Sequence, residues 1–349
     1  MRVTTITSGK SLVLKNWKFW LGLVISAVAL YLTLRGVPFA DFARALTSAN
    51  PLWFVAAVAA LLVVLAMRAV RWAAIMPAAQ AGSASIGTTF HAQNIGYMVN
   101  MILPLRLGEI ARAVVIGLRT PVSTPAALSS IVVERLLDLV TVVLLFFGFA
   151  QFIPMDASLS RAATISAVLV AVLVVVIGII IWQAARAERW IAALLARFKV
   201  RNAEAWVLRF RQFTAGFKLI GSAQRLLIVL ACTIAIWVAN LICVTLVMAA
   251  FFPPRVDQSG LMLVAANLGG AAPSAPGGLG IVQGFAKLAL VLPFGLDESR
   301  ATAFVFVWSL GQQLILIVLG LIGMARVGLS FGQLQASPAK PNPTPYPSP

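Results

Sequence analysis

The segment Ala266–Gly284 reads ANLGGAAPSAPGGLGIVQG and lies between the apolar runs Leu261–Leu263 and Leu288–Leu292. It contains six glycines and two prolines. Because glycine costs backbone entropy in a helix and proline removes a donor, the segment predicts an interrupted helix. Non-helical backbone at membrane depth is tolerated only where protein or a water-filled cavity satisfies it, and it is typical of transport sites. We therefore expect a re-entrant hairpin or broken helix; a loop at the membrane surface is the alternative.

The composition around this segment is that of a membrane protein. Of 349 residues, 61% are hydrophobic and 11% charged, and the mean hydropathy is +0.97. These values predict an all-α polytopic membrane protein. Lys and Arg outnumber Asp and Glu by 27 to 10, which predicts cytoplasmic loops and contacts with anionic lipid instead of nucleic acid. Cys232 and Cys243 lie eleven residues apart in one apolar segment, so we expect two small core residues, with no disulfide and no metal site.

Six segments are expected as full transmembrane helices: Phe19–Leu34, Pro51–Met67, Pro125–Ile153, a span that starts near Ala162 and has its core at Leu169–Trp182, Leu226–Phe252 and Ala301–Ala325. The first lacks a clear cleavage site, so a retained helix is favoured over a signal peptide. We expect a cytoplasmic basic N-terminus (1–16), one transmembrane domain (17–328) and a disordered Pro-rich tail (329–349). The basic residues predict a cell (inner) membrane protein with both termini in the cytoplasm.

The densest charge lies in 186–225, which holds nine basic and two acidic residues and is expected to be cytoplasmic. Within it, large apolar side chains recur at steps of four and three: Trp206, Phe210, Phe213, Phe217 and Ile220. This spacing predicts an amphipathic helix. The helix either lies on the anionic inner leaflet or packs on the transmembrane bundle.

A second interrupted segment, 91–119, resembles the first. Both contain Asn-(Ile/Leu)-Gly followed by Pro-x-x-Leu-Gly, at an offset of 172 for the second motif. The order of spans and hairpins predicts an inverted repeat, with repeat A at about 51–153 and repeat B at about 226–326. Such repeats place a site between their broken helices. The backbone positions expected at this site are Asn94, Pro104, Gly108, Asn267, Pro273, Pro276, Gly277, Gly278 and Gly280.

Charged residues interrupt the first hairpin. Arg106, Glu109 and Arg112 are spaced three apart, so a helix would place them on one face, where they can form an alternating ion network. Charged groups in a bilayer are costly and usually face a cavity or one another. Arg68 and Arg71, at the end of an apolar span, are interpreted as an anchor at the inner interface.

A second group of charges, Glu134, Arg135 and Asp138, lies inside an apolar segment. If the span begins at Pro125, these residues lie roughly 14–20 Å along it, where arginines can bind a lipid phosphate as a bidentate fork. If the span is Leu136–Ile153 instead, Glu134 and Arg135 lie at the inner interface.

Catalytic chemistry has little support in the residues. Ser274 lies among glycines, but His91 is the sole histidine and no nucleophile elbow is present. Glu134 and Asp138 could form an acid–base pair, which leaves a membrane-embedded lipid or glycan headgroup transferase as an alternative. We find no nucleotide loop and no metal-ligand spacing, and expect no catalytic residue, cofactor or metal.

Five motifs occur in order: R-x-x-R-W (68–72), N-I-G (94–96), P-L-R-L-G-E-I-A-R (104–112), V-E-R-L-L-D (133–138) and P-S-A-P-G-G-L-G (273–280). Together they resemble the flippase-like membrane domain of lysylphosphatidylglycerol synthases, from about residue 15 to 328. The short tail predicts a free-standing member without the soluble domain that performs aminoacyl transfer.

The resemblance implies a lipid translocase that moves a phospholipid or lipid-linked headgroup between leaflets. It implies anionic membrane lipids as partners, with a homo-oligomer or a separate synthase as further possibilities. A non-transporting partner of such a synthase is another alternative. The substrate-binding residues that it implies are Arg106, Glu109, Arg112, Glu134, Arg135 and Asp138, together with the turn Pro276–Gly280.

Overall fold

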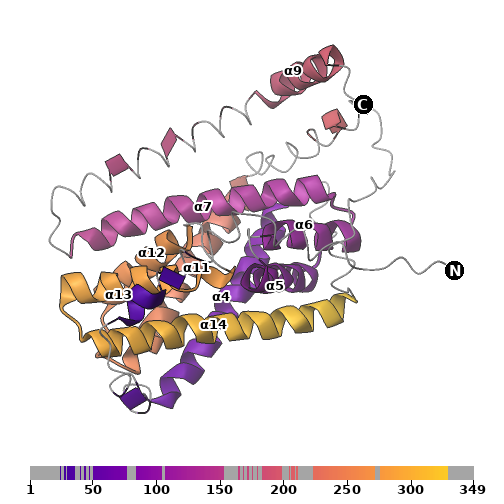
Figure 1. Cartoon of the computed structure of the whole chain (residues 1–349). Coiled ribbons are helices and arrows are strands. Elements are labelled where there is room, and N and C mark those ends of the chain that lie inside the picture. The colour runs from indigo at the N-terminus through magenta and orange to yellow at the C-terminus, as the bar shows by residue number, and fades with distance from the viewer. Residues whose placement is uncertain are drawn as a thin grey trace.

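The computed structural model describes residues 50–76, 84–103, 107–152, 183–198, 223–271 and 276–328 continuously, and single residues within 24–47, 164–179 and 204–210. These parts of the chain are helical and contain no β-strand. The helices are α4 (Pro51–Ile75), α5 (Ile86–Ile102), α6 (Gly108–Arg119), α7 (Thr124–Ala150), α9 (Ala184–Arg197), α11 (Ala223–Ala249), α12 (Val256–Ala271), η3 (Pro276–Gly278), α13 (Ile281–Phe294) and α14 (Glu298–Val327) (Figure 1).

Short polar side chains begin several of these helices. Asn50, Ser85, Ser123 and Asp297 each accept a hydrogen bond from a backbone N–H of the first helical turn, at the starts of α4, α5, α7 and α14. Such caps satisfy donors that the helix itself leaves free. Local sequence therefore sets where these four helices begin.

Within the described parts of the chain, four segments are long and apolar enough to cross a membrane: α4, α11, the segment Pro276–Phe294 and α14. With its 27 residues α7 is about 40 Å long, and it carries the three charged residues of the V-E-R-L-L-D motif. The protein is thus an all-α polytopic membrane protein, as predicted. The expected spans at 51–67, 125–153, 226–252 and 301–325 correspond to α4, α7, α11 and α14.

Other predictions concern residues that the structure describes only in part or not at all. The spans Phe19–Leu34 and Leu169–Trp182, the N-terminus 1–16 and the tail 329–349 lie wholly or largely outside the described residues. Most of the predicted amphipathic segment 206–220 does so too. Within 186–225, the structure instead defines α9, on which Trp190 and Leu194 are exposed.

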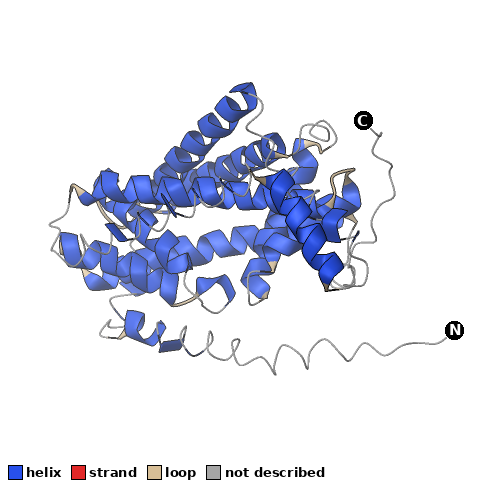
Figure 2. Ribbon diagram, turned by 90° about the horizontal axis from the view of Figure 1, so that it is seen from above, coloured by secondary structure: helices blue, strands red, loops and turns tan. Residues whose placement is uncertain are grey.

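The two halves of the described bundle have the same order of elements. Each consists of a long helix, two shorter helices and another long helix: α4 to α7 in the first half, α11 to α14 in the second. Each half packs against the other in the same way. α5 of the first half packs on α14 of the second, α12 of the second packs on α7 of the first, and the long helices α4 and α11 pack on each other. Figure 2 shows the helices of the bundle lying alongside one another. This arrangement agrees with an inverted repeat, which stays a prediction.

Both predicted interruptions separate two helices. The first hairpin comprises α5 and α6, and the second comprises α12, η3 and α13. In the second, Gly277, Gly278 and Gly280 have φ of 71°, 69° and 84°, a region that favours glycine. The Gln283 side chain accepts the Gly280 N–H at 2.7 Å, and Gln313 donates to the Gly277 carbonyl at 3.1 Å. Side chains therefore satisfy backbone groups that the broken helix frees.

Each hairpin contains an equivalent asparagine hydrogen bond, and the two hairpins contact one another. Asn94 and Asn267 each donate to the carbonyl four residues earlier, at 2.8 and 2.7 Å. A Cβ atom built on Gly277 would lie 3.3 Å from the Met101 sulfur, so η3 contacts the end of α5. Pro104 and Pro273, which we expected at the same turns, lie outside the described residues.

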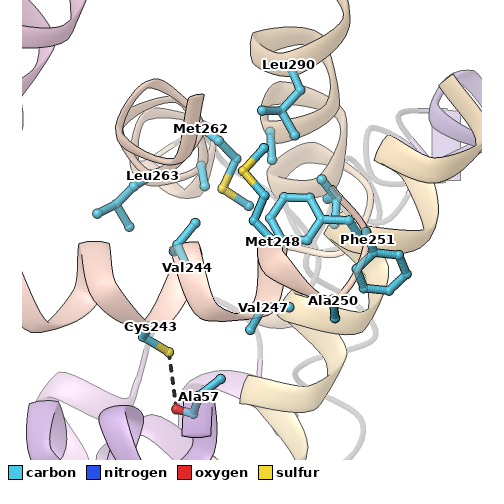
Figure 3. Packing of buried hydrophobic residues seen from close by; sticks show 14 of the residues in the cluster. Ala57, Cys243, Val244, Val247, Met248, Ala250, Phe251, Met262, Leu263 and Leu290 are labelled. Atoms are coloured by element: carbon cyan, nitrogen blue, oxygen red, sulfur yellow. Dashed lines mark hydrogen bonds between the residues drawn. The ribbon is translucent and has the colours of Figure 1, made fainter. Parts of the chain in front are cut away.

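An apolar core forms where α4, α11, α12 and α14 meet (Figure 3). Met248 and Met262 are fully buried in it. Both cysteines are free thiols, and Cys243 donates from Sγ to the Ala57 carbonyl at 3.4 Å across the α4–α11 contact. This core lies beside the charged residues of the first half and fixes α4 against α11.

The first hairpin depends on a close approach of two glycines. A Cβ atom on Gly108 would collide with the Gly96 carbonyl oxygen, which is backbone and cannot rotate away. We expect Gly108→Ala to destabilise the protein by about 1–3 kcal/mol, as overpacking does, measured by thermal denaturation in detergent. Gly148→Ala is the control, since nothing lies within 4 Å of the added atom. Equal melting temperatures for the two variants would contradict the predicted contact.

Candidate functional site

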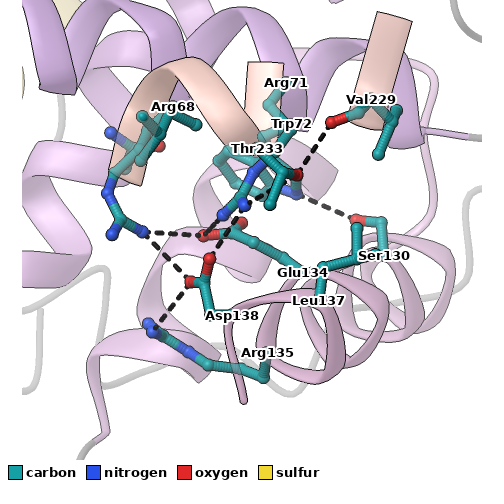
Figure 4. Close-up of polar contacts among 12 residues, drawn as sticks. Arg68, Arg71, Trp72, Ser130, Glu134, Arg135, Leu137, Asp138, Val229 and Thr233 are labelled. Carbon is teal, nitrogen blue, oxygen red and sulfur yellow. Dashed lines mark hydrogen bonds and ion pairs between the residues drawn. The ribbon is translucent and has the colours of Figure 1, made fainter. Parts of the chain in front are cut away.

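Three helices bring seven charged side chains together in the first half of the bundle. Figure 4 shows those from α4 and α7, namely Arg68, Arg71, Glu134, Arg135 and Asp138. We call this group the charge cluster. Its members are Arg68 and Arg71 of α4, Glu109 and Arg112 of α6, and Glu134, Arg135 and Asp138 of α7. Contacts of α6 and α4 with α7 make this possible.

Glu134 lies at the centre of the cluster and is fully buried. Its Oε2 accepts from Arg112 Nη1 at 3.1 Å, while its Oε1 lies 3.5 Å from Arg71 Nη2 and 3.9 Å from Arg68 Nη1. One carboxylate therefore faces three guanidinium groups from two helices. Removing one partner of a buried ion pair leaves an uncompensated charge, so this contact holds α4, α6 and α7 together.

Asp138, one turn further along α7, completes the contact with α4. Its two oxygens accept from Arg71 Nη1 at 2.8 Å and from Arg68 Nη1 at 3.1 Å. The same Arg71 nitrogen donates to Thr233 Oγ1 of α11 at 3.3 Å, and that hydroxyl donates to the Val229 carbonyl. The polar contacts thus extend to a fourth helix.

Trp72 supports the buried arginine of α6. The Arg112 guanidinium lies 4.9 Å from the centre of the indole ring, within the range of a cation–π contact. The indole N–H donates to Ser130 Oγ at 2.9 Å, which fixes the ring against α7. Trp72 therefore orients Arg112 toward Glu134.

A second part of the cluster is accessible. Arg135 Nη2 donates to Glu109 Oε1 at 3.0 Å, and its Nη1 lies 3.9 Å from Asp138 Oδ2. Glu109 Oε2 also accepts from Asn100 Nδ2 at 3.3 Å, while Asn100 Oδ1 accepts the Gly108 N–H at 2.7 Å. This pair connects α7 to the junction of the first hairpin.

The charges of the cluster do not cancel. Four arginines face three carboxylates, which leaves one positive charge in excess among the described residues. Arg112 Nε and Nη2 are buried without a hydrogen-bond partner in this part of the chain. Buried charge without compensation is costly. An arrangement of this kind is suited to binding one anion.

Five of the six predicted site residues lie in the cluster; Arg106 lies outside the described residues. We expected Glu109 and Arg112 to form a network along their own helix. In the described structure they pair with Arg135 and Glu134 of α7 instead, because α6 and α7 pack together.

From the sequence we did not expect residues of α4 at the site. We interpreted Arg68 and Arg71 as an interface anchor, and this was wrong for Arg71, whose side chain is fully buried and paired. The available signal was the spacing. Two arginines three apart match the two carboxylates Glu134 and Asp138, which lie four apart on another helix.

At the place equivalent to the Arg112–Glu134 contact, the second half carries neutral groups. Gln283 of α13 donates to Ser309 of α14 at 2.8 Å, as Arg112 of α6 donates to Glu134 of α7. The described structure also has a buried lysine in this half. Lys287 Nζ lies 2.7 Å from Glu298 Oε1 and donates to the Thr33 carbonyl at 2.8 Å. The excess positive charge of the cluster therefore belongs to the first half.

A helical membrane bundle with broken helices and a buried ionic cluster defines the class of this protein: a multi-pass integral membrane protein. The family model described as the lysylphosphatidylglycerol synthase TM region matches residues 19–320, and the chain belongs to this family. The chain is similar to a UPF0104 membrane protein of Methanothermobacter thermautotrophicus, with 26% identity over 331 residues, 89% of this chain and 96% of that protein. No solved structure matches the chain significantly.

Proposed function

We propose that this protein is a lipid translocase, which moves an anionic phospholipid or lipid-linked headgroup between the leaflets of the cell membrane. The charge cluster carries the proposal, because it has one positive charge in excess and lies within an apolar helical bundle. In this proposal both termini are cytoplasmic. A homo-oligomer or a separate synthase partner is compatible with it.

The chemistry of arginine supports a phosphate ligand. A guanidinium presents paired N–H donors that match the oxygens of a phosphate and remains charged at any physiological pH. Arg135 is the most exposed arginine of the cluster, at 43% of its side-chain surface, whereas Arg71 and Arg112 are buried. A lipid headgroup would therefore meet Arg135 first. The family name refers to a synthase of a phospholipid, which is consistent with a lipid ligand.

The hairpins support movement of that ligand. Broken helices whose ends meet are typical of transporters, in which two repeats move relative to each other around a site between them. In this protein η3 contacts the end of α5. The sequence contains no ATPase motif, so we propose a scramblase or a process driven by an ion gradient.

The experiment is a leaflet-transfer assay. Purified protein in liposomes that contain a fluorescent phosphatidylglycerol is expected to expose inner-leaflet label to an added reductant, beyond the half of the label that protein-free liposomes expose. Protein-containing liposomes that retain half of the label would contradict the proposal for this lipid. Mass spectrometry of the same lipids tests the alternative headgroup transferase, because a new lipid species would appear. Neither transfer nor a new lipid, across anionic and lipid-linked substrates, would favour a non-transporting partner of a synthase.

A further inference from the structure

We propose that a phosphodiester group of the substrate displaces the Glu109 carboxylate from Arg135 and binds the same guanidinium group. The inference rests on the proposed function and adds which ion pair is exchanged. In the absence of ligand, Glu109 neutralises Arg135 at 3.0 Å. When the headgroup binds, its phosphate replaces the carboxylate, one negative charge for another.

Arg135 and Glu109 form the accessible part of the cluster. The side chains of Arg135 and Glu109 are 43% and 23% exposed, whereas those of Glu134 and Arg71 are 0% exposed. A released Glu109 carboxylate can regain water or polar headgroups, because it already lies at the edge of the protein. Release of Glu134 would leave a charge in the interior, at a high cost in free energy. Exchange is therefore confined to the outer pair.

Asp138 is bound more closely to Arg71 and Arg68 than to Arg135. Among the described residues Arg135 makes one short contact, to Glu109, and its contact with Asp138 is longer at 3.9 Å. Asp138 is held at 2.8 and 3.1 Å by Arg71 and Arg68, so it is not free to follow Arg135. A phosphodiester offers two anionic oxygens, as a carboxylate does, and fits the same guanidinium donors. The ligand can thus replace Glu109 without disturbing the buried part of the cluster.

Glu109 also connects Arg135 to the first hairpin. The Asn100 side chain binds both the Glu109 carboxylate and the Gly108 N–H, where α6 begins. Gly108 in turn lies against Gly96 of α5. When Glu109 leaves Arg135, one of the bonds that joins this junction to α7 is lost. Binding of the phosphate therefore weakens the contact between the first hairpin and α7, while the buried Arg112–Glu134 pair still joins them.

The experiment measures binding of short-chain, water-soluble phosphatidylglycerol to the full-length protein in detergent. Glu109→Gln removes the competing charge and keeps the size of the side chain. We expect about two- to fivefold tighter binding, the range that follows from removing a partly exposed ion pair. The double variant Glu109→Gln/Arg135→Ala is expected to lose this gain. Asp257→Asn is the matched control, since it removes a carboxylate from the exposed Arg255 pair and should leave binding unchanged.

Unchanged or weaker binding by a folded Glu109→Gln variant would overturn the inference. If that variant does not fold, Glu109→Ala provides the same test, because it also removes the competing carboxylate. A second arm with inorganic phosphate distinguishes the ligand source: a gain for both ligands supports exchange with any phosphate, and a gain for the lipid alone supports exchange with a headgroup. Tighter binding by Glu109→Gln, with no lipid transfer by the wild type, would contradict the proposed function and leave the exchange standing.

Discussion

Replacing Glu134 by alanine is expected to destabilise the folded protein by about 3–5 kcal/mol, the cost of breaking a buried ion pair from one side. The Glu134 carboxylate faces Arg71, Arg112 and Arg68, and the first two have almost no exposed side-chain surface. Without it, four arginines would share two carboxylates. The loss would appear as a lower midpoint of thermal denaturation in detergent.

A second variant at Glu134 separates the effect of charge from that of shape, and a variant outside the cluster serves as a control. Glu134→Gln keeps the volume and removes the charge, so it is expected to lose most of the same stability. Asp257→Asn breaks the exposed Arg255 pair, and its effect should stay within about 1 kcal/mol because solvent screens such pairs. If Glu134→Ala and Asp257→Asn melt at the same temperature, the buried cluster does not hold the helices together.

Replacing Arg135 by alanine is expected to abolish lipid transfer while leaving the protein folded. Arg135 is the exposed arginine of the cluster, and its loss removes the donors that would meet the phosphate first. A hydrogen bond to a charged group contributes about 1.5–3 kcal/mol, which corresponds to at least a tenfold lower rate where the contact is needed in the rate-limiting step. The measurement is the leaflet-transfer assay with matched amounts of protein.

The control for this variant is Arg255→Ala, which removes an arginine that is 59% exposed and paired with Asp257 outside the cluster. It should transfer lipid at the wild-type rate. Arg135→Lys is expected to retain part of the activity, because it keeps the charge but not the bidentate fork. Transfer at the wild-type rate by Arg135→Ala would remove this residue from the mechanism.

The charge cluster could be predicted from the sequence in part. The residues of α6 and α7 were recognisable from sequence, because charged side chains in apolar segments are costly and therefore noticeable. The contribution of α4 was not, since Arg68 and Arg71 stand at the end of an apolar run, where basic residues are common. The spacing of these arginines matches that of Glu134 and Asp138, but it does not show that α7 and α11 cover the end of α4.

The sequence by itself determined that this is an all-α membrane protein and where its helices are interrupted. Apolar runs, glycine and proline act locally, and a cap such as Ser123 needs only its own turn. Tertiary structure decided which charges pair. Arg112 and Glu109 each face α7 and not each other, because ion pairs follow the helix faces that meet when the bundle packs. It also divided the cluster into a buried part around Glu134 and an accessible pair, since exposure depends on what the neighbouring helices cover.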